Sequence, residues 1–174
     1  MKQYILPVAD LYAYSLLPNH FHLLIKVKPI EILMAYFKLK KNKPFVSRNN
    51  SIPDFIMEQF SNWLNGYAKA FNKMFNRKGS LFIDYTKRIE ARSESDVTSF
   101  IFYIHKNAVH HGLRKTIGEW EFDSYNSILG EGPTDLMRQE IIDWFGSKKL
   151  FVNFHKQPIN LKTHSKTYKV FKTL

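Results

Sequence analysis

The sequence predicts an α+β fold in which an antiparallel hairpin packs with several helices. Two apolar stretches, residues 11–17 and 20–27, have the length and composition of strands, and the turn signal Pro18-Asn19 separates them. Strands joined by so short a connection pair antiparallel. Three later segments carry apolar residues at helical spacing: 30–40, 54–76 and 96–111.

The ends of these helices carry the expected signals. Pro29 stops the second strand, and the basic end of helix 30–40 complements the helix dipole. The polar segment 41–53 is expected to be a loop. Gly79 follows the second helix as a C-cap would, and the acidic, serine-rich stretch 93–96 is a typical helix start.

The remaining segments are less regular. Residues 80–91 are expected to form one strand or two short ones, and 118–132 a loop anchored by aromatic side chains. A further helix is expected over 134–145, with Thr134 or Asp135 as its N-cap. Residues 148–174 have no clear period, so we expect a basic tail there.

Composition limits the function. The chain has 174 residues, 44% of them hydrophobic, which suits one domain with a small appendage. With 0 cysteines, disulfides, zinc–thiolate sites and thiol catalysis are excluded. There is no signal-peptide pattern and no long apolar run, so we expect a cytoplasmic protein without membrane contact. The net charge of +11 and the 16% aromatic content favour a nucleic acid partner.

The pair His20 and His22 is the first candidate site. One residue separates the two histidines on a predicted strand, so both imidazoles point to the same face. Neutral imidazole is a common ligand of divalent metals. Two half-buried histidines without a ligand role are the alternative.

A second constellation lies on the helix predicted over 96–111. Tyr103, Asn107, His110 and Arg114 follow one another at i, i+4, i+7 and i+11, which places them along one stripe. If this stripe covers the histidine strand, Asn107 completes a metal site and Tyr103 lies one turn away. Alternatively, Tyr103 packs at a helix–sheet junction. Surface or packing roles are expected for the remaining histidines of this helix, His105, His110 and His111.

Three blocks of the sequence resemble the single-tyrosine HUH transposases, and more narrowly the REP-associated tyrosine transposases. Residues 13–25, AYSLLPNHFHLLI, are similar to the family signature AYxxMPNHxHLLI. Residues 71–82 are similar to its FNxxxxRKGxLF segment. Residues 102–113, with Trp120 and Ser124 beyond them, are similar to its YIHxNPVxxGL…W…S segment. The resemblance covers about residues 11–128.

The resemblance implies a ferredoxin-like antiparallel sheet with packed helices, and a Mg²⁺- or Mn²⁺-dependent enzyme that nicks and joins single-stranded DNA. By position, His20 and His22 match the metal-binding histidines of the family. Tyr103 matches the nucleophile, which forms a covalent 5′-phosphotyrosine, and Asn107 matches a polar residue that reaches the metal. Single-stranded or hairpin DNA is the implied partner, and a homodimer is a candidate assembly.

Basic residues would contact the DNA. The expected nucleic-acid-binding residues are Lys38, Lys40, Lys73, Arg77, Lys78 and Arg114.

The chain departs from the family pattern in three ways. Ala108 stands where the family usually has proline, which a helix tolerates because alanine is the better helix former. Only residues 1–10 precede the first strand, whereas the family has a strand and a helix there, so we expect a sheet that lacks one strand and either exposes an edge or pairs with a partner strand. Residues after 128 do not align, which divides the chain into a transposase-like domain, 1–128, and a C-terminal helix and basic tail, 129–174.

Two rival functions stay open at this point. The first is a truncated, non-catalytic DNA-binding remnant of such a transposase, which keeps the basic surface. The second is a basic RNA-binding module whose sheet stacks bases on aromatic side chains. Alternate strand positions carry no aromatic pattern that would favour the RNA-binding function.

Overall fold

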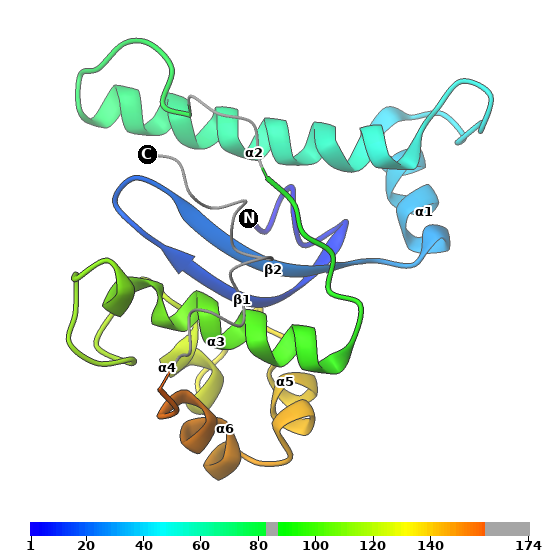
Figure 1. The fold of residues 1–174 in the computed structure, drawn as a ribbon. Helices are drawn as coiled ribbons and strands as arrows, with labels where there is room; N and C mark the ends of the chain where they lie inside the picture. The colour runs from blue at the N-terminus through cyan, green and yellow to red at the C-terminus, as the bar shows by residue number, and fades with distance from the viewer. Residues whose placement is uncertain (83–86, 159–174) are drawn as a thin grey trace. The chain divides into compact units, whose positions relative to one another are not determined.

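A computed structural model describes residues 1–82 and 87–158. The fold is α+β: one two-stranded antiparallel hairpin and six helices are present in the described residues. These residues form two compact units. We call residues 1–11 and 25–82 the long-helix unit, and residues 12–24 and 87–158 the histidine unit. Figure 1 shows the elements with their labels.

The hairpin consists of β1 (Ala9–Leu16) and β2 (Phe21–Val27), close to the ranges that the sequence predicts. Its turn is closed by a hydrogen bond of 2.8 Å from the Leu17 backbone N–H to the His20 carbonyl. The turn half of the hairpin belongs to the histidine unit, where it presents His20 and His22.

The long-helix unit contains α1 (Ile30–Lys41) and α2 (Ile52–Met74). Its core is formed by four buried apolar side chains: Val8, Leu33, Phe37 and Phe55. Helix α2 begins two residues before the predicted start because the Ser51 hydroxyl accepts the Asp54 N–H at 3.3 Å and a proline is tolerated in the first turn. It ends at Met74, and Asn76 follows in the left-handed region with φ of 48°.

The histidine unit contains α3 (Glu94–His110), α4 (Tyr125–Leu129), α5 (Arg138–Phe145) and α6 (Lys148–His155). Helix α3 begins at the predicted cap, where the Ser93 hydroxyl accepts the Asp96 N–H at 3.1 Å. It packs against the turn end of the hairpin through a cluster of Leu17, Ala108 and Trp120 (Figure 1). This cluster fixes which face of α3 lies toward the histidines.

The ferredoxin-like sheet implied by the resemblance is not seen in the described residues, which contain one two-stranded sheet. The strand expected over 80–91 is absent at its described positions, 80–82 and 87–91. Burial does alternate over 88–91, where residues 88 and 90 are exposed and residues 89 and 91 half-buried, but no strand among the described residues pairs with this stretch. Residues 83–86 lie outside the described residues.

The expected exposed edge is covered near the end of β1. Residues 122–124 lie antiparallel to β1: Leu16 N–H donates to the Phe122 carbonyl at 2.9 Å, and Ser124 N–H to the Tyr14 carbonyl at 3.0 Å. The Trp120 indole N–H donates to the Leu16 carbonyl at 3.0 Å. The loop predicted over 118–132 therefore satisfies the outer edge of β1, and it also contains α4.

Of two predictions for the C-terminal part, the helix over 134–145 is confirmed with a later start, and the irregular tail is wrong over residues 148–155. The helix expected from 134 begins at Arg138, after Thr134 accepts the Leu136 N–H in a local turn. Residues 148–155 form α6 instead of an irregular tail, and the Ser147 hydroxyl caps it by accepting the Leu150 N–H. Phe151 is fully buried on its inner face. Residues 159–174 of the expected tail lie outside the described part of the chain.

None of the helices in the described ranges combines the length and the hydrophobicity that a bilayer-spanning segment needs.

Truncation of Phe151 tests the packing of α6. We expect Phe151→Ala to lower the free energy of unfolding by about 3–5 kcal/mol, because it removes a fully buried ring and leaves a cavity. The neighbouring Leu150 is 54% exposed, so Leu150→Ala should change it by less than about 0.5 kcal/mol. Unfolding in guanidinium chloride measures the free energy of unfolding of both variants. Equal losses in the two variants would contradict the packing of α6 described here.

Candidate functional site

The two histidines lie side by side at the start of β2. Their ring centroids are 4.9 Å apart and the rings are nearly perpendicular, at 89°. Nδ1 of His20 lies 2.7 Å from Asn19 Oδ1. Because a carboxamide oxygen only accepts, this contact assigns the proton to Nδ1 and leaves the lone pair of His20 on Nε2.

Both imidazoles favour the neutral form. Burial, followed by the nearby His20 and His111, lowers the pKa of His22 to about 4. Burial and then His111 also lower the pKa of His20. A neutral imidazole has a nitrogen lone pair to offer, so at neutral pH the pair is in the form that can bind a divalent cation.

Helix α3 brings Tyr103 to the same place. The rings of Tyr103 and His22 meet edge to face, with centroids 5.5 Å apart and an interplanar angle of 79°. Burial raises the pKa of the Tyr103 phenol, and a hydrogen bond from the Asn107 side chain partly opposes this shift. The phenol is therefore protonated at neutral pH, with a hydrogen-bond donor beside its oxygen.

Asn107 lies one turn after Tyr103 and is 1% exposed. Its Nδ2 donates to the Tyr103 backbone carbonyl at 3.2 Å. Its Oδ1 is buried and has no hydrogen-bond partner among the described residues. An unsatisfied buried carboxamide oxygen costs about 1–3 kcal/mol, so this atom is a candidate ligand atom for a cation.

A third imidazole, which the sequence analysis assigned to the surface or to packing, joins the pair. His111 is exposed and caps the C-terminal end of α3. Its ring centroid lies 5.1 Å from that of His20. Nevertheless, no three His, Asp or Glu side chains in the described ranges are arranged to hold a metal ion. A metal site here would need the Asn107 oxygen beside the two β2 histidines.

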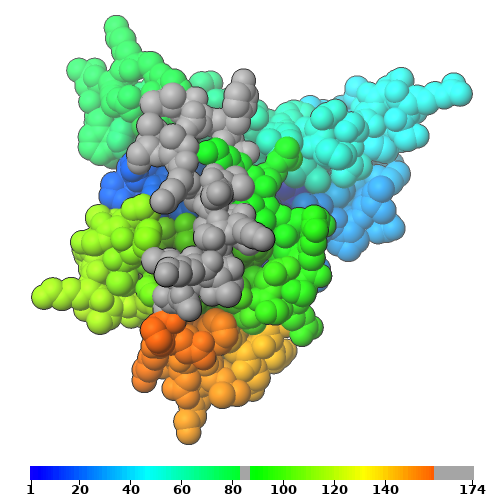
Figure 2. All heavy atoms as spheres, in the orientation of Figure 1, coloured from blue at the N-terminus to red at the C-terminus, as the bar shows by residue number. Residues whose placement is uncertain are grey.

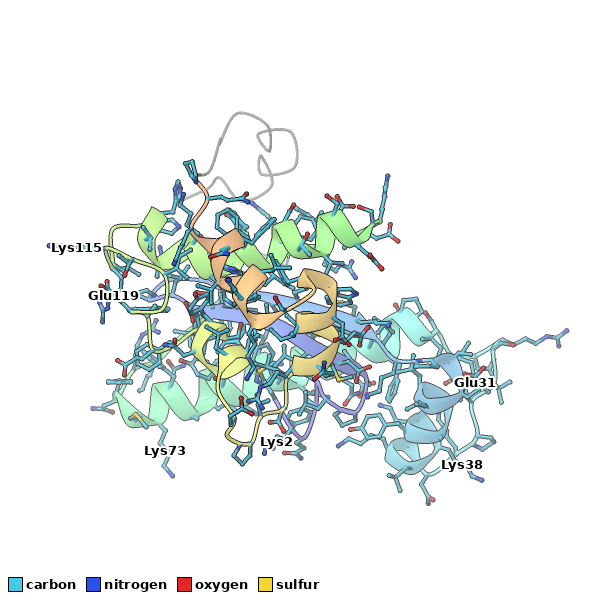
Figure 3. All side chains as sticks on the ribbon, turned by 90° about the horizontal axis from the view of Figure 1, so that it is seen from below. Lys2, Glu31, Lys38, Lys73, Lys115 and Glu119 are labelled. Atoms are coloured by element: carbon cyan, nitrogen blue, oxygen red, sulfur yellow. The ribbon has the colours of Figure 1, made fainter. Side chains whose placement is uncertain are left out.

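The predicted DNA-contacting residues fall in both units. In the histidine unit, the Arg114 guanidinium lies 5.0 Å from the Trp120 ring centroid and donates to the Leu113 and Glu119 carbonyls, so it already has a structural role. The other five are exposed side chains of the long-helix unit: Lys38, Lys40, Lys73, Arg77 and Lys78. Figure 3 shows Lys38 and Lys73 extending from their helices.

A buried polar chain that the sequence did not reveal supports α3 from within the histidine unit. His105 is fully buried, with Nδ1 2.9 Å from His155 Nε2 and Nε2 2.8 Å from the Ser124 hydroxyl. His155 Nδ1 donates to the Phe151 carbonyl at 2.8 Å. Because that carbonyl only accepts, the proton of His155 is on Nδ1. If His105 also carries its proton on Nδ1, both imidazoles are neutral and each contact has one donor and one acceptor.

This series of hydrogen-bonded side chains joins four segments of the fold. Ser124, at the start of α4, also accepts the Tyr14 backbone N–H of β1 at 2.9 Å. The polar chain therefore ties β1, α3, α4 and α6 together in the interior that backs Tyr103 and Asn107. Burial lowers the pKa of His155 to about 4 and holds the pKa of His105 well below its usual range.

Acidification should destabilise this unit. Folding lowers the pKa of four imidazoles below the ordinary value of 6.5: His20, His22, His105 and His155. The stability that their neutral forms contribute is present above pH 6.5 and is lost as pH falls toward about 4. Asp123 acts oppositely, because burial raises its pKa from 3.8 to about 6 and its contribution is lost as pH rises through that value.

With four imidazoles against one carboxyl, we expect the free energy of unfolding, measured with urea, to fall between pH 7 and pH 5. The variant His155→Gln should show a smaller fall than the parent chain. A stability that is independent of pH over this range would contradict the buried neutral imidazoles.

No protein-family model, curated protein or solved structure matches the chain. The resemblance of its three short blocks to HUH transposases therefore remains a prediction. What the protein does has to be inferred from the site itself: two neutral imidazoles, a buried carboxamide oxygen and a phenol, held together by β2 and α3.

Proposed function

We propose that the histidine unit is a metal-dependent, transposase-like single-stranded DNA endonuclease and strand transferase. Tyr103 is the nucleophile, and His20, His22 and Asn107 hold a Mg²⁺ or Mn²⁺ ion. The edge contact between the Tyr103 and His22 rings, at 5.5 Å, is the observation that carries this proposal. It supports a phenol within reach of a phosphate bound beside the imidazoles.

The donor set fits such an ion. Two imidazole nitrogens and one carboxamide oxygen suit Mn²⁺, and Mg²⁺ also accepts oxygen ligands together with water and phosphate. Asn107 Oδ1 is buried without a hydrogen-bond partner in the described part of the chain, so a cation would satisfy it. A divalent cation bound here would polarise the scissile phosphate and stabilise its developing negative charge.

The chain's own residues account for the bond changes. The Tyr103 oxygen attacks the phosphorus and forms a phosphotyrosine, while the bond to the 3′ oxygen breaks. The phenol loses its proton and the 3′ oxygen gains one, so the reaction needs no external energy source. Because burial raises the pKa of Tyr103, the proton leaves during attack, and the Asn107 side chain stabilises the developing phenolate by its hydrogen bond.

Rejoining is the reverse of this step. A 3′-hydroxyl attacks the phosphotyrosine, a new 3′–5′ phosphodiester forms, and Tyr103 recovers its proton. The proposal needs only the hairpin and α3 of the ferredoxin-like arrangement implied by the resemblance. Single-stranded or hairpin DNA is the proposed substrate, because the net charge of +11 favours a polyanion.

A covalent trap tests the nucleophile. Incubated with end-labelled hairpin DNA and Mn²⁺, the protein should form an adduct that survives denaturing electrophoresis, and Tyr103→Phe should form none. Tyr36→Phe is a suitable control, because the hydroxyl of Tyr36 donates to the Gln3 carbonyl, in the long-helix unit. DNA binding without an adduct across a set of hairpins would favour the rival function, a non-catalytic DNA-binding protein.

Calorimetry with Mn²⁺ alone tests the ligand set. We expect His22→Ala and Asn107→Ala to weaken binding at least about tenfold, because each removes a ligand atom. Asn107→Asp should retain or strengthen binding, since a carboxylate replaces a neutral oxygen. His110→Ala changes an exposed imidazole on the same helix and should leave affinity unchanged. Equal affinity in all four variants would contradict the site.

A further inference from the structure

The C-terminal end of α2 carries a row of aromatic rings that reaches solvent. Tyr67, Phe71 and Phe75 are spaced at i, i+4 and i+8, so they lie along one stripe of the helix. Their centroids are 6.2 Å and 4.5 Å apart in sequence order. Tyr67 is 53% exposed and Phe75 is 60% exposed, and Figure 2 shows the end of α2, in green, on the molecular surface.

The turn that follows the helix completes this surface. The chain reverses through Asn76 and Gly79, which have φ of 48° and 93°, and Asn72 Nδ2 donates to the Gly79 carbonyl at 2.9 Å. The reversal brings the Phe82 ring centroid to 6.2 Å from that of Tyr67. It also places the Arg77 guanidinium 5.9 Å from the Phe71 ring centroid.

The charged residues on the segment that carries these rings, 59–82, are all positive. The sequence contains no Asp or Glu from residue 59 to residue 82. Over the same stretch it contains four cations, all of them exposed: Lys69, Lys73, Arg77 and Lys78. A partly exposed aromatic row beside these cations is suited to a ligand with flat apolar faces and a negative backbone.

We propose that this surface, which we call the aromatic platform (Tyr67, Phe71, Phe75 and Phe82), binds single-stranded DNA by base stacking. The neighbouring cations bind the phosphates, and the rings stack on the bases without selecting a sequence. The choice of DNA rests on the proposed function, whereas the stacking chemistry does not. The platform would hold the unpaired part of a substrate, in the long-helix unit, independently of the metal and of Tyr103.

A second copy of the chain is the other occupant that an exposed aromatic row could accept. The four cations disfavour it, because two copies meeting through this surface would bring like charges together. Self-association is therefore an outcome that the test must separate from DNA binding.

The experiment measures binding of a fluorescent oligothymidine by anisotropy, in EDTA and in the Tyr103→Phe background, so that neither metal nor cleavage contributes. We expect Tyr67→Ala and Phe75→Ala each to weaken binding by about fivefold or more, without changing its salt dependence. Lys73→Gln should weaken binding. It should also reduce by about one the slope of the logarithm of the binding constant against the logarithm of the salt concentration. Tyr67→Phe keeps the ring and should restore affinity.

The controls decide between the explanations. Phe122→Ala removes a 50% exposed ring of the histidine unit and should leave binding unchanged. An abasic oligonucleotide should bind the parent chain and Tyr67→Ala equally, because it offers no base to stack. Unchanged affinity in both alanine variants, or equal affinity for oligouridine RNA, would overturn the proposal. So would a parent dimer that Tyr67→Ala dissociates while DNA binding persists.

The two proposals fail separately. If stacking is absent and the Tyr103 adduct still forms, the proposed enzyme activity stands and the aromatic platform is contradicted. If stacking is observed and no adduct forms, the aromatic platform stands and the proposed enzyme activity is contradicted.

Discussion

The packing of α3 on the turn of the hairpin is the contact on which the candidate site depends. Leu17, Ala108 and Trp120 form that contact, and the first two lie within a few residues of a site group. Leu17 is followed by the turn that positions His20, and Ala108 follows Asn107 directly. A rotation of α3 by one residue, about 100°, would carry both Tyr103 and Asn107 away from the imidazoles.

The orientation of α3 is held from its other side as well. His105, on α3, is fully buried and connects through its two ring nitrogens to α6 and to the start of α4. Because a buried polar group that loses its partner costs more than a hydrogen bond yields, such a network tolerates few arrangements. The apolar cluster and the hydrogen-bonded imidazoles thus constrain the same helix, which carries Tyr103 and the buried, unsatisfied oxygen of Asn107.

The parts of the fold that depend on local pattern could be predicted from the sequence, and the parts that depend on tertiary packing could not. Alternating residues and the Pro18-Asn19 turn identify the hairpin, and Ser93 marks the start of α3. Helix α6 was missed because its lysines resemble a basic tail, although Ser147 and the i, i+4 pair Phe151 and His155 were available as signals. The strand expected over 80–91 is not formed at residues 80–82 and 87–91, although burial alternates over 88–91, because strand formation also needs a pairing partner and that partner cannot be read from local pattern.

The same distinction applies to the site. Spacing alone places His20 with His22, and Tyr103 with Asn107, on common faces. Spacing cannot place the face of the strand against the face of the helix. Nor can it show that His111 approaches His20 or that Asn107 Oδ1 lacks a hydrogen-bond partner, because both features follow from how α3 packs on the hairpin. The contacts of Arg114 are likewise a product of packing: its charge suggests a phosphate contact, and the structure adds contacts with the Trp120 ring and two backbone carbonyls that spacing does not reveal.

A crystal soaked in Mn²⁺ and measured for anomalous scattering tests the central claim most directly. The account predicts one strong peak within bonding distance of a His20 nitrogen, a His22 nitrogen and Asn107 Oδ1, with the Tyr103 hydroxyl next to it. An ion bound by other residues, or no ion between these three at millimolar Mn²⁺, would contradict it.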